Sequence, residues 1–275
     1  MGRKIKLIGL DLDGTLLNEK KEITGHTREI LQRAIAKGIV VMVATGRPWT
    51  GVPSELQNFS GMHYALTSNG ARVLEVKTGK ILIQHLLAFD KAKKALEIAG
   101  KYDTLQEVYF NGQGYISKRQ FENLPHYHNN PYVWEYIGTT RIVVPDVVKF
   151  FLERKDPVDK VQLLFANTKE KQKAWEELDA ESGMVLTSSL ENNIEINEMG
   201  VNKGKSLKEL GMLLGIRPEE IMACGDGEND REMLKEVGFG VAMRNAQEDV
   251  KAVADYITDT NEEEGVAKAI EKFVL

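Results

Sequence analysis

The chain has 275 residues, 42% of them hydrophobic and 28% charged, a balance typical of a folded globular protein that excludes intrinsic disorder. The net charge is −5 and no long basic run is present, so the sequence gives no support for a nucleic-acid partner. The single cysteine excludes an internal disulfide and fits a reducing compartment. The sequence shows no signal-peptide core and no membrane-spanning stretch. We therefore expect a cytoplasmic protein with no membrane partner, and its oligomeric state stays open.

The first 85 residues alternate between apolar strands and amphipathic helices. Leu7–Leu10 reads as a buried strand, and Thr24 can cap a helix that Gly38 closes. The other elements predicted here are strands over 39–44 and 64–67 and a helix near 49–58. Antiparallel strands over 71–76 and 81–84 are predicted as well, with turn signals at Asn69-Gly70 and at Thr78-Gly79-Lys80. Such alternation indicates β-α-β units and a parallel sheet.

Between residues 86 and 196 the pattern changes to short strands and helices in no regular alternation. A helix from Asp90 carries alanines and leucine on one face. The other elements predicted here are strands over 106–110, 160–166, 184–187 and 193–196, and a helix near 169–179. The aromatic cluster of Tyr132, Trp134 and Tyr136 is interpreted as core or as an alternating strand. This mixture predicts a second, α+β unit.

Regular alternation returns after residue 196. The elements predicted there are a helix ending at Gly215, a strand over 221–225, a helix near 229–237, a strand over 240–243, and a last helix capped by Asn261 with Glu264 in a capping box. The fold class is therefore predicted to be α/β. Residues 1–85 and 197–275 would form a Rossmann-like, doubly wound parallel sheet, and residues 86–196 an inserted α+β cap domain.

Acidic residues follow two of the predicted strands of the core. Asp11 and Asp13 come after the first strand, and Asp226 and Asp230 come after the strand over 221–225. Loops at the carboxyl edge of a doubly wound sheet meet in one crevice, so we expect the four acids to converge. Two carboxylates 4 Å apart repel by about 4 kcal/mol at an effective dielectric of 20, and a cation would neutralise them. Hard oxygen ligands favour Mg²⁺ over Zn²⁺.

Other polar groups near these acids suit a phosphate ligand. Thr45 offers a hydroxyl and Gly46 an unhindered N–H, and Lys203 at a helix start offers a compact positive charge. Asn229 adds neutral donors in the acidic loop. A phosphate monoester held there would face a carboxylate nucleophile. A second carboxylate two residues away could then act as general acid and base.

Four motifs occur in an order that resembles the haloacid dehalogenase-like hydrolases: Asp11-Leu12-Asp13-Gly14-Thr15, Thr45-Gly46-Arg47, Asn202-Lys203-Gly204 and Gly225-Asp226-Gly227-Glu228-Asn229-Asp230. The long insertion between the second and third motifs resembles the Cof-type phosphatases of that superfamily. The segment Ser68-Asn69-Gly70-Ala71 resembles them too. Each motif alone is short, and four in order form a specific signal.

The resemblance implies a role for each matched residue. Asp11 would be the nucleophile and a Mg²⁺ ligand, and Asp13 the acid/base that binds the metal through its backbone carbonyl. Asp226 would be the third protein ligand, with Asp230 supporting the metal site. The groups implied to hold the phosphoryl group are the side chains of Thr45, Lys203 and Asn229 and the backbone N–H groups of Leu12 and Gly46.

Together these features predict a Mg²⁺-dependent phosphatase. Its partner would be a small phosphorylated metabolite, including sugar phosphates, and the reaction would pass through an aspartyl-phosphate. Two alternatives stay open at this point. One is a phosphotransferase or phosphomutase that acts on sugar phosphates. The other is a non-catalytic protein that binds phosphorylated metabolites for regulation.

Overall fold

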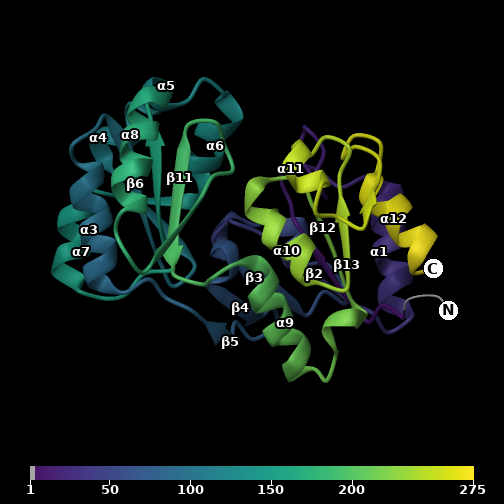
Figure 1. Cartoon of the computed structure of the whole chain (residues 1–275). Helices are drawn as coiled ribbons and strands as arrows, with labels where there is room; N and C mark the ends of the chain where they lie inside the picture. Colours follow the sequence, from purple (N-terminus) through teal and green to yellow (C-terminus); the bar gives the residue numbers. More distant parts are fainter. Residues whose placement is uncertain (1–3) are drawn as a thin grey trace. The chain divides into compact units, whose positions relative to one another are not determined.

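A computed structural model describes residues 4–275 and divides them into two compact units (Figure 1). The first unit contains residues 4–46, Val52–Gln84 and Asn202–Leu275. The second contains Arg47–Gly51 and His85–Val201. Most of the second unit is therefore one continuous insertion into the sequence of the first.

The first unit is built on an eight-stranded sheet with the order β14-β13-β12-β1-β2-β3-β4-β5. All neighbouring pairs from β14 to β3 are parallel, and β4 and β5 are added in antiparallel orientation. The order runs outward in opposite directions from the neighbouring strands β1 and β12, which makes this the topological switch point. The predicted doubly wound sheet is confirmed. Its strands are β1 (Leu7–Leu10), β2 (Val40–Ala44), β3 (Tyr64–Thr67), β4 (Arg72–Glu75), β5 (Ile81–Gln84), β12 (Ile221–Gly225), β13 (Phe239–Ala242) and β14 (Tyr256–Ile257).

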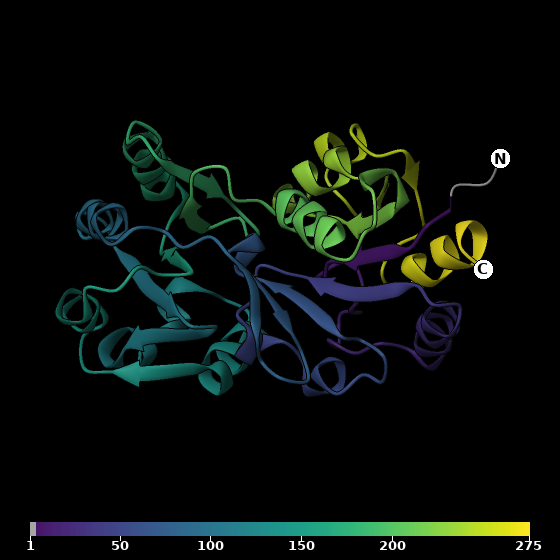
Figure 2. The same ribbon diagram turned by 90° about the horizontal axis from the view of Figure 1, so that it is seen from below.

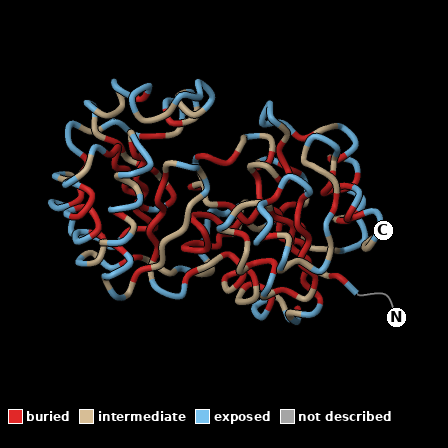
Figure 3. Tube along the Cα trace, turned by 45° about the horizontal axis from the view of Figure 1, so that its top comes forward, coloured by how far each residue is buried: buried red, intermediate tan, exposed pale blue. Residues whose placement is uncertain are grey.

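Helices cover both faces of this sheet (Figure 2). Helices α1 (Gly25–Ala36) and α12 (Gly265–Phe273) lie on one face, and α9 (Lys203–Leu213) and α10 (Arg231–Glu236) lie on the other. Strands β1, β2, β3, β12 and β13 are mostly buried between these layers, and Figure 3 marks the buried parts of the chain in red. Such two-sided burial explains why the strands read as continuous apolar runs.

The predicted ends of α1 are confirmed. The Thr24 hydroxyl accepts a hydrogen bond from the backbone N–H of Thr27, and Gly38, with a φ of 81°, follows the helix in the left-handed conformation. A glycine is favoured there because it adopts a positive φ without the cost that a residue with a Cβ incurs.

The second unit contains a six-stranded sheet with the order β10-β11-β9-β6-β7-β8. Helices α3 (Phe89–Ala99), α7 (Val147–Arg154) and α8 (Thr168–Asp179) pack on one apolar core with it. A smaller core involves α4 (Lys118–Phe121), α5 (Leu124–Tyr127) and α6 (Pro131–Thr140). The strands are β6 (Thr104–Phe110), β7 (Gln113–Ser117), β8 (Arg141–Val144), β9 (Lys160–Phe165), β10 (Met184–Thr187) and β11 (Asn193–Glu198). The predicted α+β character of this region is confirmed.

Two predicted helices begin or end differently in the structure. The helix expected near 49–58 is split into a 3₁₀ turn, η1 (Trp49–Gly51), and a short helix, α2 (Ser54–Gln57). Pro53 separates them because it has no backbone N–H to continue the first turn. The last helix begins at Gly265, so the Asn261 cap is wrong. The Asn261 side chain instead donates to the Leu17 carbonyl at 2.9 Å.

The aromatic cluster of the second unit is helical. Tyr132, Trp134 and Tyr136 lie on α6, so the alternative of an alternating strand is wrong. Asn130 caps this helix by accepting from the N–H of Tyr132, and Pro131 occupies its first position, a combination that favours a helix start. Within residues 4–275, no helix combines the length and apolar character that crossing a membrane requires.

Candidate active site

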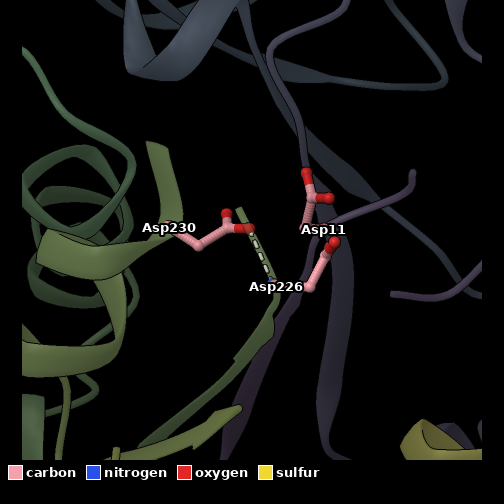
Figure 4. A group of neighbouring side chains, drawn as sticks. All are labelled: Asp11, Asp226 and Asp230. Carbon is pink, nitrogen blue, oxygen red and sulfur yellow. Dashed lines mark hydrogen bonds between the residues drawn. The ribbon is translucent and has the colours of Figure 1, made fainter. Parts of the chain in front are cut away.

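The structure brings three of the four predicted acids together (Figure 4). Asp11 directly follows β1 and Asp226 directly follows β12, and these strands are parallel neighbours. Asp230 ends the short 3₁₀ turn η4 (Glu228–Asp230) in the same loop as Asp226. One carboxylate oxygen from each of the three acids lies within 4.8 Å of those of the other two. The switch point of the sheet therefore carries a compact acidic cluster, as the topology predicts.

A single ammonium group is inserted into this cluster. Lys203 Nζ lies 2.6 Å from Asp11 Oδ1 and 2.7 Å from Asp230 Oδ1, and the lysine is fully buried. The side chain of Asn202 accepts from the N–H of Lys205 at 2.7 Å and thereby caps α9. This cap starts the helix at Lys203 and directs its side chain from the first turn.

Burial and mutual repulsion change the acidity of these groups. Burial, followed by repulsion from Asp230, raises the pKa of Asp11 well above its ordinary value. The same two causes raise the pKa of Asp226 to about 7. Burial alone would lower the pKa of Lys203, but attraction to Asp11 and Asp230 raises it above its ordinary value. One ammonium thus only partly offsets three carboxylates.

Asp230 organises the acidic loop as well as the ammonium. Its Oδ2 accepts from the backbone N–H groups of Asp226 and Gly227, both at 3.0 Å, while its Oδ1 accepts from Lys203. Gly225 is required beside it, since a Cβ there would lie 2.5 Å from Asp230 Cγ. Both oxygens of Asp230 therefore have protein donors, which fits the predicted supporting role at a metal site.

Asp13 is placed differently from the expectation. Its carboxylate does not belong to the described three-acid cluster, and Oδ1 accepts from Lys21 Nζ at 2.8 Å. Both side chains are 43% exposed. The carboxylate of Asp13 therefore lies outside this tight group, although its charge is near enough to contribute to the raised pKa of Asp226.

The residues predicted to hold a phosphoryl group lie in the neighbouring loops. Thr45 is buried directly after β2, and its N–H donates to the Leu66 carbonyl at 2.9 Å. Gly46 follows it and is half-buried. Leu12 is buried between Asp11 and Asp13. Asn229 lies in η4.

Sequence reasoning missed three residues that shape the site. Thr15 Oγ1 donates to Asp226 Oδ1 at 2.6 Å. Asn69 Oδ1 accepts from Asn229 Nδ2 at 3.1 Å. Gly14 has a φ of 78°, and a Cβ there would lie 2.2 Å from Asp226 Oδ2. Thr15 and Gly14 belong to the first motif and could have been found there, whereas Asn69 reads locally as a turn residue.

The donor set fits a hard divalent cation. The described cluster contains carboxylates and neither cysteine nor histidine, and oxygen-only ligands suit Mg²⁺ better than a softer metal. Side chains of Asp11 and Asp226, with the backbone carbonyl of Asp13, are the groups that could bind such an ion. A divalent charge would also relieve the repulsion that raises the pKa of Asp11 and Asp226.

Comparisons with known proteins agree with this geometry. The sequence profile of the haloacid dehalogenase-like hydrolases matches residues 8–270. The 5-amino-6-(5-phospho-D-ribitylamino)uracil phosphatase YcsE of Bacillus subtilis is 32% identical over 271 residues, which cover 98% of this chain and 96% of that protein. Phosphatase YwpJ of the same organism is 32% identical, with 96% and 98% covered.

A solved structure of a haloacid dehalogenase-like hydrolase from B. subtilis superposes with a TM-score of 0.85 at 30% identity, covering 98% of this chain and all (100%) of the other. The match of the sequence profile spans all four motifs, and the structural match extends over both units. The chain belongs to the haloacid dehalogenase-like hydrolase family.

Proposed function

We propose that the chain, a phosphatase of this family, hydrolyses phosphate monoesters of small metabolites with Mg²⁺ and an aspartyl-phosphate intermediate. The observation that carries the proposal is the acidic cluster with its single ammonium. Carboxylate oxygens of Asp11, Asp226 and Asp230 lie within 4.8 Å of one another, and Lys203 Nζ contacts two of these residues. One ammonium does not balance the charge of three carboxylates, so the site requires a further positive charge. A cation bound there would also attract an anionic phosphate.

Asp11 and Asp226 would hold the metal with their side chains and Asp13 with its backbone carbonyl. When bound, Mg²⁺ supplies positive charge that offsets the charge on the phosphoryl oxygens. Asp230 keeps the loop of Asp226 in place through the two N–H groups that its Oδ2 accepts from. Lys203 orients the carboxylate of Asp11 and supplies a second positive charge beside it.

The first half of the proposed reaction transfers the phosphoryl group to Asp11. A carboxylate oxygen of Asp11 forms a bond to phosphorus while the bond from phosphorus to the ester oxygen breaks. Asp13 gives its proton to that oxygen, and a neutral alcohol leaves. The position of Asp13 supports this role, because its side chain is 43% exposed and therefore accessible to water.

The second half returns the enzyme to its starting state. Asp13, now a carboxylate, takes a proton from water, and the water oxygen attacks the phosphorus of the aspartyl-phosphate. The bond between phosphorus and the Asp11 oxygen breaks, which releases inorganic phosphate and restores both carboxyl groups. A correctly placed general acid and base contributes about 10²–10⁴-fold to such a rate.

The substrate class is inferred from chemistry and from one relative. The relative YcsE is named for a substrate with a phosphorylated ribityl chain, which is a sugar-alcohol phosphate. We infer that this chain acts on a primary phosphate of a small sugar, a sugar alcohol or a related metabolite. The inserted second unit, absent from a minimal doubly wound sheet, is the part that would select among leaving groups.

Phosphate release from para-nitrophenyl phosphate tests the reaction class. The purified protein is expected to release phosphate with Mg²⁺ and to lose this activity when the metal is chelated. Asp11→Asn should abolish release, whereas Asp179→Asn, which changes an exposed acid at the end of α8, should not change it. Activity that survives Asp11→Asn would contradict a nucleophilic Asp11.

The same preparation separates the alternative functions. A screen over phosphorylated metabolites, with and without a sugar acceptor, measures both free phosphate and transferred phosphate. Dominant transfer to the acceptor would favour a phosphotransferase or mutase over a phosphatase. Tight binding of phosphorylated metabolites without release of phosphate over the whole panel would favour a regulatory binding protein.

A further inference from the structure

The turn between β3 and β4 has an unusual backbone. Ser68, Asn69 and Gly70 have φ values of 52°, 59° and 101°, and all three are buried. Within the described residues 4–275, no other run of three consecutive residues has positive φ. The left-handed region is unfavourable for serine and tolerated by asparagine. Backbone of this kind persists where its surroundings fix it, and it is frequent at functional sites.

Contacts from the loop of Thr45 and from helix α9 fix this turn. The N–H of Asn69 donates to the carbonyl of Thr45 at 3.1 Å. The hydroxyl of Ser206, on α9, donates to the carbonyl of Gly70 at 2.8 Å. A Cβ at position 70 would lie 2.6 Å from the carbonyl oxygen of Asn202, so the turn packs directly against the helix start that carries Lys203.

The side chain of Asn69 connects the turn to the acidic loop. Its Oδ1 accepts a hydrogen bond from Asn229 Nδ2 at 3.1 Å. A primary amide is planar, with a carbonyl acceptor at one end and an NH2 group with two N–H donors at the other. An acceptor fixed by a rigid turn therefore determines both the plane of the Asn229 amide and which side presents its donors.

We propose that Asn69 is a positioning residue for phosphoryl transfer, which orients the Asn229 amide toward the phosphoryl group without touching the substrate. This inference rests on the proposed function, because the phosphoryl-binding role of Asn229 is part of that proposal. The strained turn fixes the backbone of Asn69, because it is bonded both to the loop of Thr45 and to α9. Loss of the Asn69 side chain would leave Asn229 in place but free to rotate.

The test is a double-mutant cycle of Asn69→Gly and Asn229→Ala. Glycine adopts the φ of position 69 without steric strain, so in the folded state this variant removes only the side chain. We expect Asn69→Gly to lower kcat/KM on para-nitrophenyl phosphate by about 3–10-fold, the effect of one hydrogen bond. The Kd for inorganic phosphate with Mg²⁺, measured by calorimetry, should rise by a similar factor. In the Asn229→Ala background, Asn69→Gly should have no further effect.

Asn111→Gly is the matched control. Asn111 is also a left-handed asparagine, with a φ of 51°, but it is exposed in the turn between β6 and β7 of the second unit. This substitution should leave both kcat/KM and the phosphate Kd unchanged. Equal losses from Asn69→Gly in both backgrounds, or no loss in either, would overturn the proposal.

The outcomes also separate this inference from the proposed function. A wild-type protein that binds phosphate but releases none would contradict the phosphatase, whereas the cycle of phosphate Kd values would still decide the role of Asn69. If Asn69→Gly does not fold, Asn69→Ser enters the same cycle with the same expectation. Ser68 shows that this turn accommodates serine at positive φ, and a serine hydroxyl is too short to replace the amide.

Discussion

Lys203 Nζ and Asp11 Oδ1 are 2.6 Å apart in the buried interior, although the two residues are separated by 192 positions in sequence. The same ammonium contacts Asp230. Without the lysine, two buried carboxylates would have no positive partner, and breaking a buried pair in this way costs about 3–5 kcal/mol. Lys203→Met should therefore lower the free energy of unfolding by about that amount in metal-free buffer, as measured by urea denaturation.

Lys208→Met is the matched control on the same helix. Lys208 pairs with Glu236 near the surface, and its side chain is 31% exposed, so its removal should cost about 1 kcal/mol or less. Equal losses for the two variants would show that the burial of Lys203 has no special energetic consequence. Mg²⁺ should restore part of the stability of Lys203→Met, because it supplies the missing positive charge.

Asp226→Asn should inactivate the enzyme but stabilise its metal-free form. In the folded state the pKa of Asp226 is raised from 3.8 to about 7, chiefly by burial. A carboxyl group with a raised pKa lowers stability as pH increases, with the loss beginning above the unfolded value and complete above pH 7. Asparagine keeps an acceptor for Thr15 and carries no charge. The Tm without metal should thus rise by a few degrees at pH 8.

Tm values of the wild type and of Asp226→Asn at two pH values, with and without Mg²⁺, test whether the charge of Asp226 causes this change in stability. At pH 4 the two metal-free proteins should have nearly equal Tm, since Asp226 is then protonated in the folded state. With Mg²⁺ at pH 8 the order should reverse, because only the wild type gains stability from the metal. A Tm gain for Asp226→Asn that is as large at pH 4 as at pH 8 would contradict the charge argument.

Asp13 and Lys21 should differ strongly in their effect on the rate. Loss of the general acid and base in Asp13→Asn should lower kcat by about 10²–10⁴-fold. Lys21 contacts Asp13 in a pair that is half-exposed on both sides, so Lys21→Met should change kcat by no more than about fivefold. Steady-state assays on para-nitrophenyl phosphate measure both. A loss for Lys21→Met as large as for Asp13→Asn would make the lysine part of the catalytic machinery.

The parts of the fold that carry the site were predictable because of how parallel strands are buried. Leu7–Leu10 and Ile221–Gly225 are fully buried between layers of helices, so they read as unbroken apolar runs that end in acidic loops. Strands β7 and β8 were not predicted. Their pairing depends on distant partners, such as the buried ion pair of Arg141 on β8 with Glu107 on β6, which no local pattern reveals.

The candidate site also has a part that could be predicted from the sequence and a part that could not. Asp11, Asp226 and Lys203 follow from strand ends and a helix start, which topology brings to one edge. The contact of Asn69 with Asn229 depends on the conformation of a turn and on packing between separate loops, so the sequence could not predict it. The hydrogen bond between Asp13 and Lys21 depends on the side-chain conformations of two partly exposed residues. The spacing of Asp11 and Asp13 in the sequence contains no information about these conformations.

Gly14→Ala should impair metal binding as well as stability. Gly14 has a φ of 78°, and a Cβ there would lie 2.2 Å from Asp226 Oδ2, so the carboxylate or the loop must move. Gly38 is the matched control, because it has nearly the same φ, 81°, with no atom within 4 Å of an added Cβ. Both alanine variants should lose about 1–2 kcal/mol from the left-handed backbone. Only Gly14→Ala should also raise the Mg²⁺ concentration needed for half-maximal activity, by tenfold or more. Titration of phosphate release with Mg²⁺ measures the effect on metal binding, and urea denaturation of both variants measures the effect on stability. An unchanged Mg²⁺ requirement in Gly14→Ala would mean that Asp226 does not bind the metal through the carboxylate oxygen beside Gly14.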